Sequence, residues 1–392
     1  MTSQRLPIGM LIVLWLVGWT LRVPILSAPP LATRIADTFG LNEAGVGAIT
    51  MLPVIAIAFG AIPAALIIAR FGLRIAIVGG LLVMVAASVA RGYVPSTAML
   101  FTVSVIMGLG VAVFQTALPA ATRVWTPTHV VLGSAVYLNG MMFGELSGAG
   151  LTLPLILPIA GGDWRFALIL WAIPIVLIAA LVALMRLPNA KSDEAQTSWA
   201  AVRKALPQWN DGRVWQYGLL MAGSTVTFFV INAYAGTLLH ARGESEYLES
   251  LLLAFNSMPL VASFIVLAAP NWIGMRGPIA ISAVLSAAGL AGFTLLEGWA
   301  SWGAALLVGV ASTVELILLV SLPVKIASGI AVTRLSAGII LVGLSIAFVL
   351  PILGGWLADS MGSIELALVP SLIFSIALLP ALGRAPQYPN YE

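Results

Sequence analysis

Three ionisable residues lie near the middle of long apolar runs: Arg22, Glu145 and Glu315. At the centre of a bilayer such a charge costs roughly 2.5–3.5 kcal/mol, so the side chain faces a protein interior or a wet cavity and usually has a partner. Arginine stays protonated, and its planar fork of donors suits a carboxylate or another small oxyanion. A buried carboxyl group can take up a proton. The three residues are therefore candidates for binding a small solute, for taking up a proton or for pairing with one another.

Arg22 lies in the segment Trp19–Pro24, too deep in its run for the side chain to reach a headgroup layer. Pro24 removes a backbone donor and bends the helix. A broken helix beside a buried cation is a common way to build a binding site at mid-membrane. Two interpretations stay open: Arg22 contacts a substrate, or it forms a structural ion pair with Glu145 or Glu315.

The two glutamates have different surroundings in the sequence. Glu145 is flanked by Gly140, Gly144 and Gly148, whose spacing lets another helix approach closely. A carboxylate in such a face needs a partner or a proton, so Glu145 either titrates with a coupled proton or neutralises Arg22. Glu315 is the one full charge deep in the second half of the chain. A proton site, a cation site and an ion pair across the two halves are all open for it.

Neutral polar and aromatic side chains within the apolar runs complete the candidate site. Each is either a hydrogen bond between helices or a contact to substrate. Trp19 lies one helical turn from Trp15 and too deep to be an interfacial anchor, so it is a candidate wall of an aromatic pocket. The predicted substrate-binding residues are Arg22, Trp19, Gln115, Tyr137, Asn139, Asn232 and Tyr234. Glu145 and Glu315 are the predicted proton-coupling or charge-balancing residues.

The composition of the chain places these residues in a membrane. The 392 residues include 18 Lys or Arg and 15 Asp or Glu, or 8% charged, whereas hydrophobic residues make up 60%. Soluble proteins have roughly 25% charged residues, so a water-soluble fold and a disordered chain are both excluded. Apolar runs of about 20 residues without strand-like alternation predict an all-α membrane protein.

Several function classes are excluded in the same way. The chain has no Cys and two distant His, which argues against disulfides, thiol nucleophiles and metal sites. It lacks a nucleophile elbow, a zinc-protease motif and a phosphate-binding loop, so we expect neither an enzyme nor a cofactor. Its net charge of +3 is scattered rather than gathered into a nucleic-acid patch. The expected partners are a small-molecule substrate, the lipid bilayer and protons, and we expect a monomer.

The apolar runs predict twelve transmembrane helices in two pseudo-symmetric six-helix bundles. A polar interval divides them into an N-terminal bundle at 1–186, a linker at 187–213 and a C-terminal bundle at 214–392. The predicted spans are 8–36, 44–68, 75–91, 97–121, 131–158, 164–186, 214–238, 248–270, 278–296, 302–323, 333–357 and 364–383.

The positions of Lys and Arg predict the orientation of these spans. Of the 18 basic residues, 13 fall on the side of the N-terminus, 4 on the opposite side, and Arg22 within the first run. Because Lys and Arg are retained in the cytoplasm, we expect a multi-pass protein of the inner (plasma) membrane with both termini cytoplasmic.

Local motifs give this architecture a family resemblance. The loop Ala69–Arg74 resembles the short conserved loop of the major facilitator superfamily, with Ala69 at the position that is usually acidic. Ile273–Gly277 is a remnant of the same loop in the second half. The glycine-rich run around Glu145 is similar to the antiporter motif, with Glu145 in place of its usual proline. The resemblance implies the major facilitator fold, a secondary transporter and alternating access.

Within that superfamily the chain most resembles the cyanate-porter group, which includes cyanate and nitroimidazole transporters. The segments Leu21–Pro24 and Gly108–Pro119 carry this resemblance, together with Arg91. It implies proton-coupled transport of a small anionic or nitro-bearing solute, with Arg22 binding the anionic or nitro group. The alternative is a proton-coupled efflux pump for hydrophobic or cationic drugs, in which Glu145 and Glu315 bind cargo or protons and Arg22 is structural.

Overall fold

The computed structural model describes residues 7–185, 206–327 and 330–382, and the regular structure in these ranges is helical throughout. Polar caps begin several helices in the loops, as at Asn42, whose side chain accepts from the amide of Gly45 (3.1 Å). The first half contains α1 (Ile8–Thr20), α2 (Val23–Leu26), α3 (Ala32–Phe39), α4 (Glu43–Phe71), α5 (Leu73–Arg91), α6 (Thr97–Trp125), α7 (Val130–Glu145), α8 (Leu157–Ile159) and α9 (Trp164–Leu184). The second half contains α11 (Gly212–Ala241), α12 (Leu248–Ala268), α13 (Arg276–Leu295), α14 (Gly298–Ile326), α15 (Ile330–Met361) and α16 (Val369–Leu382).

The helices follow the predicted spans in order along the chain. In the described ranges, ten are long and apolar enough to cross a membrane. An eleventh span is a pair, Leu132–Gly150 and Thr152–Ile159, bent by 55°, and the shorter apolar helix Val369–Pro380 occupies the twelfth predicted position. The bend lies between two stretches of π-helix, Leu146–Gly150 and Thr152–Ile156, a form that is frequent at functional sites. The predicted all-α membrane fold is confirmed.

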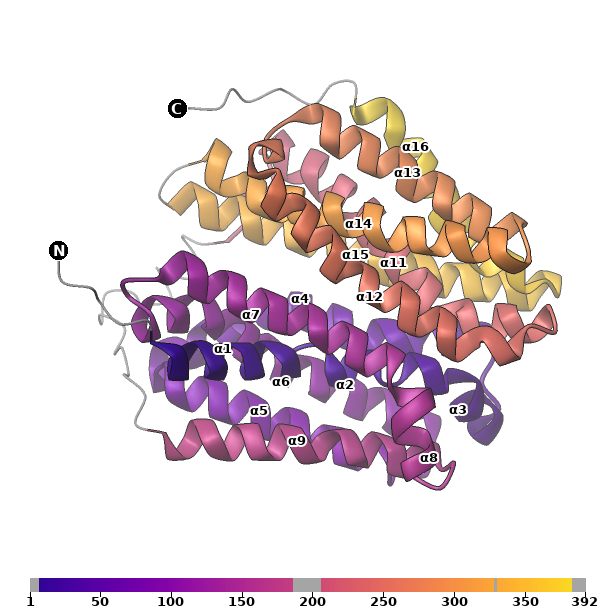
Figure 1. The fold of residues 1–392 in the computed structure, drawn as a ribbon, viewed down its shortest axis with the longest axis horizontal. Helices are drawn as coiled ribbons and strands as arrows, with labels where there is room; N and C mark the ends of the chain where they lie inside the picture. The colour runs from indigo at the N-terminus through magenta and orange to yellow at the C-terminus, as the bar shows by residue number, and fades with distance from the viewer. Residues whose placement is uncertain (1–6, 186–205, 328–329, 383–392) are drawn as a thin grey trace.

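The two halves lie side by side with their helices roughly parallel (Figure 1). They meet mainly where α4 packs on α15 and where α7 packs on α12. The α1 end of the molecule is defined here as the end at which α1 begins, and the α4 end as the opposite one, where α4 begins. Most of the predicted linker 187–213 lies outside the described residues, and α11 begins at Gly212.

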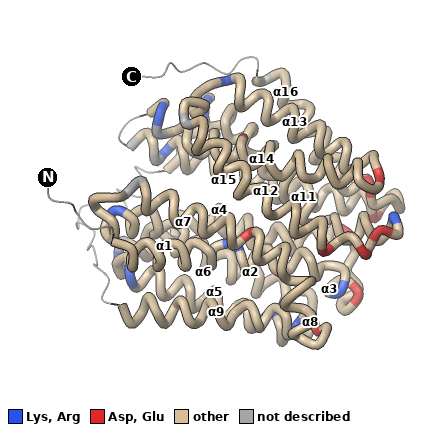
Figure 2. The backbone as a smooth tube through the Cα atoms, in the orientation of Figure 1, with Lys and Arg blue, Asp and Glu red and all other residues tan. Residues whose placement is uncertain are grey.

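Charged residues are concentrated at the two ends of the helices. Figure 2 shows Lys and Arg mainly at the α1 end and Asp and Glu mainly at the α4 end, with a nearly uncharged stretch between them. This uncharged stretch is what a hydrocarbon layer about 30 Å thick requires. The few charges within it are therefore the ones that need a specific explanation.

Candidate functional site

The first span is broken at Arg22. Helix α1 ends at Thr20 and α2 begins at Val23, with Arg22 in the turn between them at φ −112° and ψ −28°. Pro24 has no amide hydrogen to donate, so the helical hydrogen-bond ladder is interrupted at this point. The predicted break beside the buried cation is confirmed, and it places the Arg22 side chain within the bundle.

Arg91 stabilises this break. It is the last residue of α5, only 1% of its surface is exposed, and its Nη2 donates to the carbonyl of Pro24 at 2.7 Å. The sequence predicts Arg91 on the side opposite the N-terminus, at the end of an apolar run, whereas the structure buries it against the broken helix. Its position at the end of an apolar run gives no sign of this contact, which depends on how α5 packs on α2.

Arg22 is paired with Glu145. Its Nε lies 3.1 Å from Oε1 of Glu145, and the two side chains are 16% and 12% exposed. Of the two partners that sequence analysis left open, the structure selects Glu145. No hydrogen bond joins the terminal nitrogens of Arg22 to another residue in the described ranges, so these donors remain available to a solute.

The glycine face of α7 brings this pair together. A Cβ atom at Gly144 would overlap the carbonyl oxygen of Trp19, one at Gly140 that of Trp15, and one at Gly148 would lie 2.9 Å from that of Val23. Only glycine therefore allows α7 to lie this close to α1 and α2, as the spacing predicts.

Two tryptophans of α1 are hydrogen-bonded across the same interface. Nε1 of Trp15 donates to Oδ1 of Asn139 at 3.0 Å, and Nε1 of Trp19 donates to Oγ of Ser147 at 2.8 Å. The ring of Trp19 lies 6.1 Å from that of Trp171. Four of the predicted residues, Trp19, Arg22, Asn139 and Glu145, thus lie along one contact between helices.

Tyr137 shares the α1–α7 contact, whereas two other predicted residues, Gln115 and Asn232, lie on other helices. Gln115 of α6 is partly buried, and its Oε1 has no hydrogen-bond partner among the described residues. Tyr137 of α7 is partly buried and its backbone packs against Gly18. Asn232 of α11 is buried and accepts from Nδ2 of Asn256 at 3.0 Å, which joins α11 to α12 in the second half. Neither the contacts of Gln115 nor those of Asn232 connect them to Arg22.

Tyr234 belongs to a contact between the halves. It is fully buried, and its hydroxyl approaches the carbonyl oxygens of Pro351 (2.7 Å) and Glu43 (3.0 Å). Beside it, Oδ1 and Oδ2 of Asp359 accept from the amides of Glu43 (2.8 Å) and Ala44 (3.1 Å). These five residues form the α4–α15 junction, in which the second half caps the first turn of a helix of the other half.

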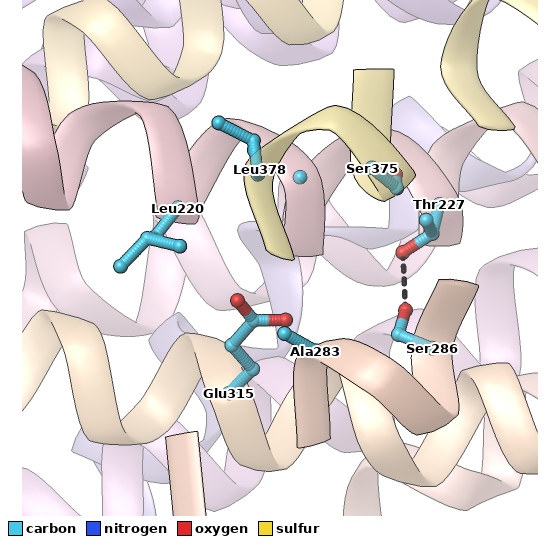
Figure 3. Close-up of a pocket in the computed structure, with 8 residues that line it drawn as sticks. Leu220, Thr227, Ala283, Ser286, Glu315, Ser375 and Leu378 are labelled. Carbon is cyan, nitrogen blue, oxygen red and sulfur yellow. Dashed lines mark hydrogen bonds between the residues drawn. The ribbon is translucent and has the colours of Figure 1, made fainter. Parts of the chain in front are cut away.

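Glu315 lies apart from all of these groups. It is 2% exposed on α14 and lines a cavity of about 10 Å³ between helices of the second half (Figure 3). The ion pairs found in the described ranges are Arg22–Glu145 and Arg213–Asp211. Within the described ranges, Glu315 therefore does not form the ion pair across the halves that was one of its interpretations.

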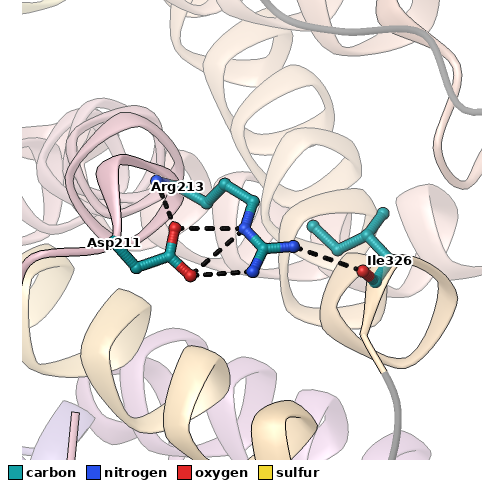
Figure 4. A network of polar contacts seen from close by, with 3 residues as sticks. All are labelled: Asp211, Arg213 and Ile326. Atoms are coloured by element: carbon teal, nitrogen blue, oxygen red, sulfur yellow. Dashed lines mark hydrogen bonds and ion pairs between the residues drawn. The ribbon is translucent and has the colours of Figure 1, made fainter. Parts of the chain in front are cut away.

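The second ion pair lies at the start of the span Gly212–Ala241, where Asp211 precedes the helix. Arg213 lies 2.8 Å from Asp211 through Nη2, and its Nη1 donates to the carbonyl of Ile326 at 3.4 Å (Figure 4). Hydrogen bonds from Arg213 hold the pKa of the Asp211 carboxyl below its usual range. The contact ties the start of α11 to the end of α14, where the second half begins.

Comparison with known proteins agrees with this architecture. The model of the Major Facilitator Superfamily matches residues 10–328. The 2-nitroimidazole transporter of Escherichia coli (strain K12) is 26% identical over 370 residues, which cover 93% of this chain and 91% of that protein. A bacterial homologue of the human lysosomal transporter Spinster, in its inward-facing and unoccupied conformation, superposes with a TM-score of 0.78 at 14% identity, covering 98% and 97% of the two chains. The nucleoside transporter NupG superposes with a TM-score of 0.77 at 13% identity, covering 96% and 99%.

Proposed function

Because the chain belongs to the Major Facilitator Superfamily, and is thus a secondary transporter rather than an enzyme, we propose that it carries a small anionic or nitro-bearing solute. The solute crosses the inner membrane by alternating access, and the transport of an anionic solute is coupled to protons. The observation that carries this proposal is the arginine at the broken first span, whose Nε faces Glu145 while its terminal nitrogens are not hydrogen-bonded to described residues.

Recognition of the solute rests on these terminal donors. A guanidinium group presents parallel N–H bonds that fit the two oxygens of a carboxylate or a nitro group. Trp19 and Trp15 lie on the same helix, and their indole N–H groups are already bonded to α7 and the π-helix after it, so their rings are held in fixed orientations. The Escherichia coli relative is a 2-nitroimidazole transporter, which supports a nitro-bearing solute.

Charge balance at Arg22 supports coupling to protons. The pair with Glu145 is neutral, so an added anion would leave one uncompensated negative charge in a medium of low dielectric constant. A proton on Glu145 removes that charge and releases the guanidinium for the anion. Transport of an anion therefore takes one proton at Glu145, whereas a neutral nitro compound needs none.

The α4–α15 junction supports alternating access. Asp359 and Tyr234 of the second half bond to Glu43 and Ala44 of the first half, and these hydrogen bonds keep the α4 end closed. Access from that end requires that they break. Because they join the two halves and not helices within one half, they can break without unfolding either bundle.

The test of the proposal combines binding with a variant. A thermal-shift screen of the purified protein against small organic anions, cyanate-like ions and nitroheterocycles identifies solutes, because a ligand that binds the native state raises its melting temperature. Arg22→Ala should weaken the binding of a solute so identified by about 10-fold to 100-fold, through loss of charged hydrogen bonds worth roughly 1.5–3 kcal/mol.

Arg34→Ala is the matched control, since it removes an exposed arginine of α3. It should leave binding and uptake unchanged. Normal uptake by a folded and inserted Arg22→Ala protein would remove Arg22 from the mechanism.

The drug-efflux alternative makes a different prediction. It requires an acidic residue that binds the cargo, and the unpaired Glu315 is the residue that favours it. The cavity at Glu315 has a volume of only about 10 Å³, which does not admit an organic cation. Binding of a cationic drug that survives in Arg22→Gln and is lost in Glu315→Gln would favour this alternative.

A further inference from the structure

The cavity at Glu315 is lined by residues from four helices of the second half. Its lining residues come from α11 (Leu220, Gly223, Thr227), α13 (Ala283, Ser286), α14 (Glu315) and α16 (Ser375, Leu378). Figure 3 shows the carboxyl group of Glu315 pointing from α14 into the space between the other three helices. A side chain at Gly223 would come within 3.1 Å of Leu378, so glycine keeps this space open.

The hydroxyl groups that line the cavity each donate their one proton to another group. Thr227 donates to the carbonyl of Ser224 at 2.9 Å, and therefore Ser286, 2.8 Å away, donates to Thr227. Ser375 donates to the carbonyl of Ser371 at 2.8 Å. Each hydroxyl has one proton and two lone pairs, so the oxygens of Ser286 and Ser375 offer only acceptors. When Glu315 is ionised, the cavity therefore presents oxygen acceptors without a donor.

We propose that Glu315, Ser286 and Ser375 bind a monovalent metal cation of the size of sodium. Hard cations take oxygen ligands, and an arrangement of acceptors without donors is what such an ion requires. A cavity of about 10 Å³ holds one particle of the size of a water molecule. A single carboxylate balances one positive charge, so a divalent ion would remain uncompensated in these apolar surroundings.

Other charged groups do not contribute to this cavity. Glu315 is the one ionisable residue among those that line it from α11, α13, α14 and α16. The described ranges contain no cluster of three or more His, Cys, Asp or Glu side chains that could hold a metal ion. The Arg22–Glu145 pair lies on α1 and α7 of the other half, so the two sites are separate.

The experiment measures the melting temperature of the purified protein at constant pH and ionic strength. Sodium chloride replaces choline chloride in steps, and potassium chloride serves as a second series. We expect a saturable rise with sodium and a smaller one with the larger potassium ion, because only binding to the native state stabilises it. Glu315→Gln should abolish the response to sodium. Ser286→Ala retains the carboxylate and should weaken the apparent affinity by about tenfold, as expected for one lost ligand.

Glu297→Gln is the matched control, because Glu297 lies at the start of the same helix and outside the cavity. It should retain the full response. The proposal is overturned if the melting temperature follows total salt whatever the cation, or if Glu315→Gln still responds to sodium. It is also overturned if a pH titration without sodium accounts for the whole effect, because Glu315 would then bind only a proton. None of these measurements uses the solute, so their outcome is independent of the Arg22 proposal.

Discussion

At the scale of single residues, Arg22 and Glu145 neutralise one another's charge. An arginine or a glutamate alone would be an uncompensated charge within the apolar spans, whereas the pair at 3.1 Å is neutral. The same pairing makes the site sensitive to protons and to charged solutes, since either one changes the net charge around the two groups. Glu145 is thus the residue at which pH should enter the function.

The substitution Glu145→Gln tests this role. In the native protein an anion binds together with a proton, so its affinity should fall as the pH rises. Glutamine has no proton to exchange, so the variant should bind the anion with an affinity that does not depend on pH. A neutral nitro compound should show no pH dependence in either protein. Binding isotherms over a series of pH values measure this, and an unchanged pH profile in the variant would exclude Glu145 as the coupling group.

At the scale of helices, the contact between α1 and α7 depends on Gly144. In Gly144→Ala the added methyl group meets the carbonyl of Trp19, which is backbone and cannot turn away. The helices must separate, and we expect a lower melting temperature and a weakened site. Gly79→Ala is the matched control, because it lies within α5 with nothing within 4 Å of the added atom. There alanine should stabilise the helix by up to about 1 kcal/mol. Equal melting temperatures for the two variants would contradict this account.

The α4–α15 junction makes a prediction about conformation. Asp359→Asn removes the negative charge from the first turn of α4 and leaves one amide acceptor in place of two carboxylate oxygens. We expect a larger population that is open at the α4 end. The chain has no cysteine, so spin labels at Asp37→Cys and Met361→Cys, both at exposed positions of the two halves, are specific. The distance distribution between them should gain a longer component.

The control for this measurement is Ser360→Ala. Its hydroxyl donates to Leu357 of its own helix at 2.9 Å, so the variant leaves the contact between the halves intact. An identical distance distribution for Asp359→Asn and the control would show that the junction does not hold the α4 end closed.

At the scale of the whole molecule, charge is divided between the two ends. Lys and Arg are mainly at the α1 end and Asp and Glu mainly at the α4 end (Figure 2). Because basic loops stay in the cytoplasm, we predict that the α1 end and both termini face it. A fluorescent protein fused to either terminus should fluoresce, since it folds in the cytoplasm. A signal from only one of the two fusions would contradict the even number of spans.

The sequence by itself determined the class of fold. A bilayer requires long apolar helices, and twelve such runs can be read directly from the chain because each is a local property of about 20 residues. The positions of the buried charges and the break at Pro24 are local in the same sense. These features therefore identified Arg22 and Glu145 as candidates before their distance was known.

Which of these residues meet was decided only by the tertiary structure. Arg22 pairs with Glu145 and not with Glu315 because the glycines of α7 bring it onto α1, whereas Glu315 lines a cavity with residues of three other helices of the second half. Tyr234 contacts backbone carbonyls across the halves, and Arg91 contacts the carbonyl of Pro24. Such contacts depend on the angle and depth at which distant helices pack, and the periodicity of one helix contains no information about that.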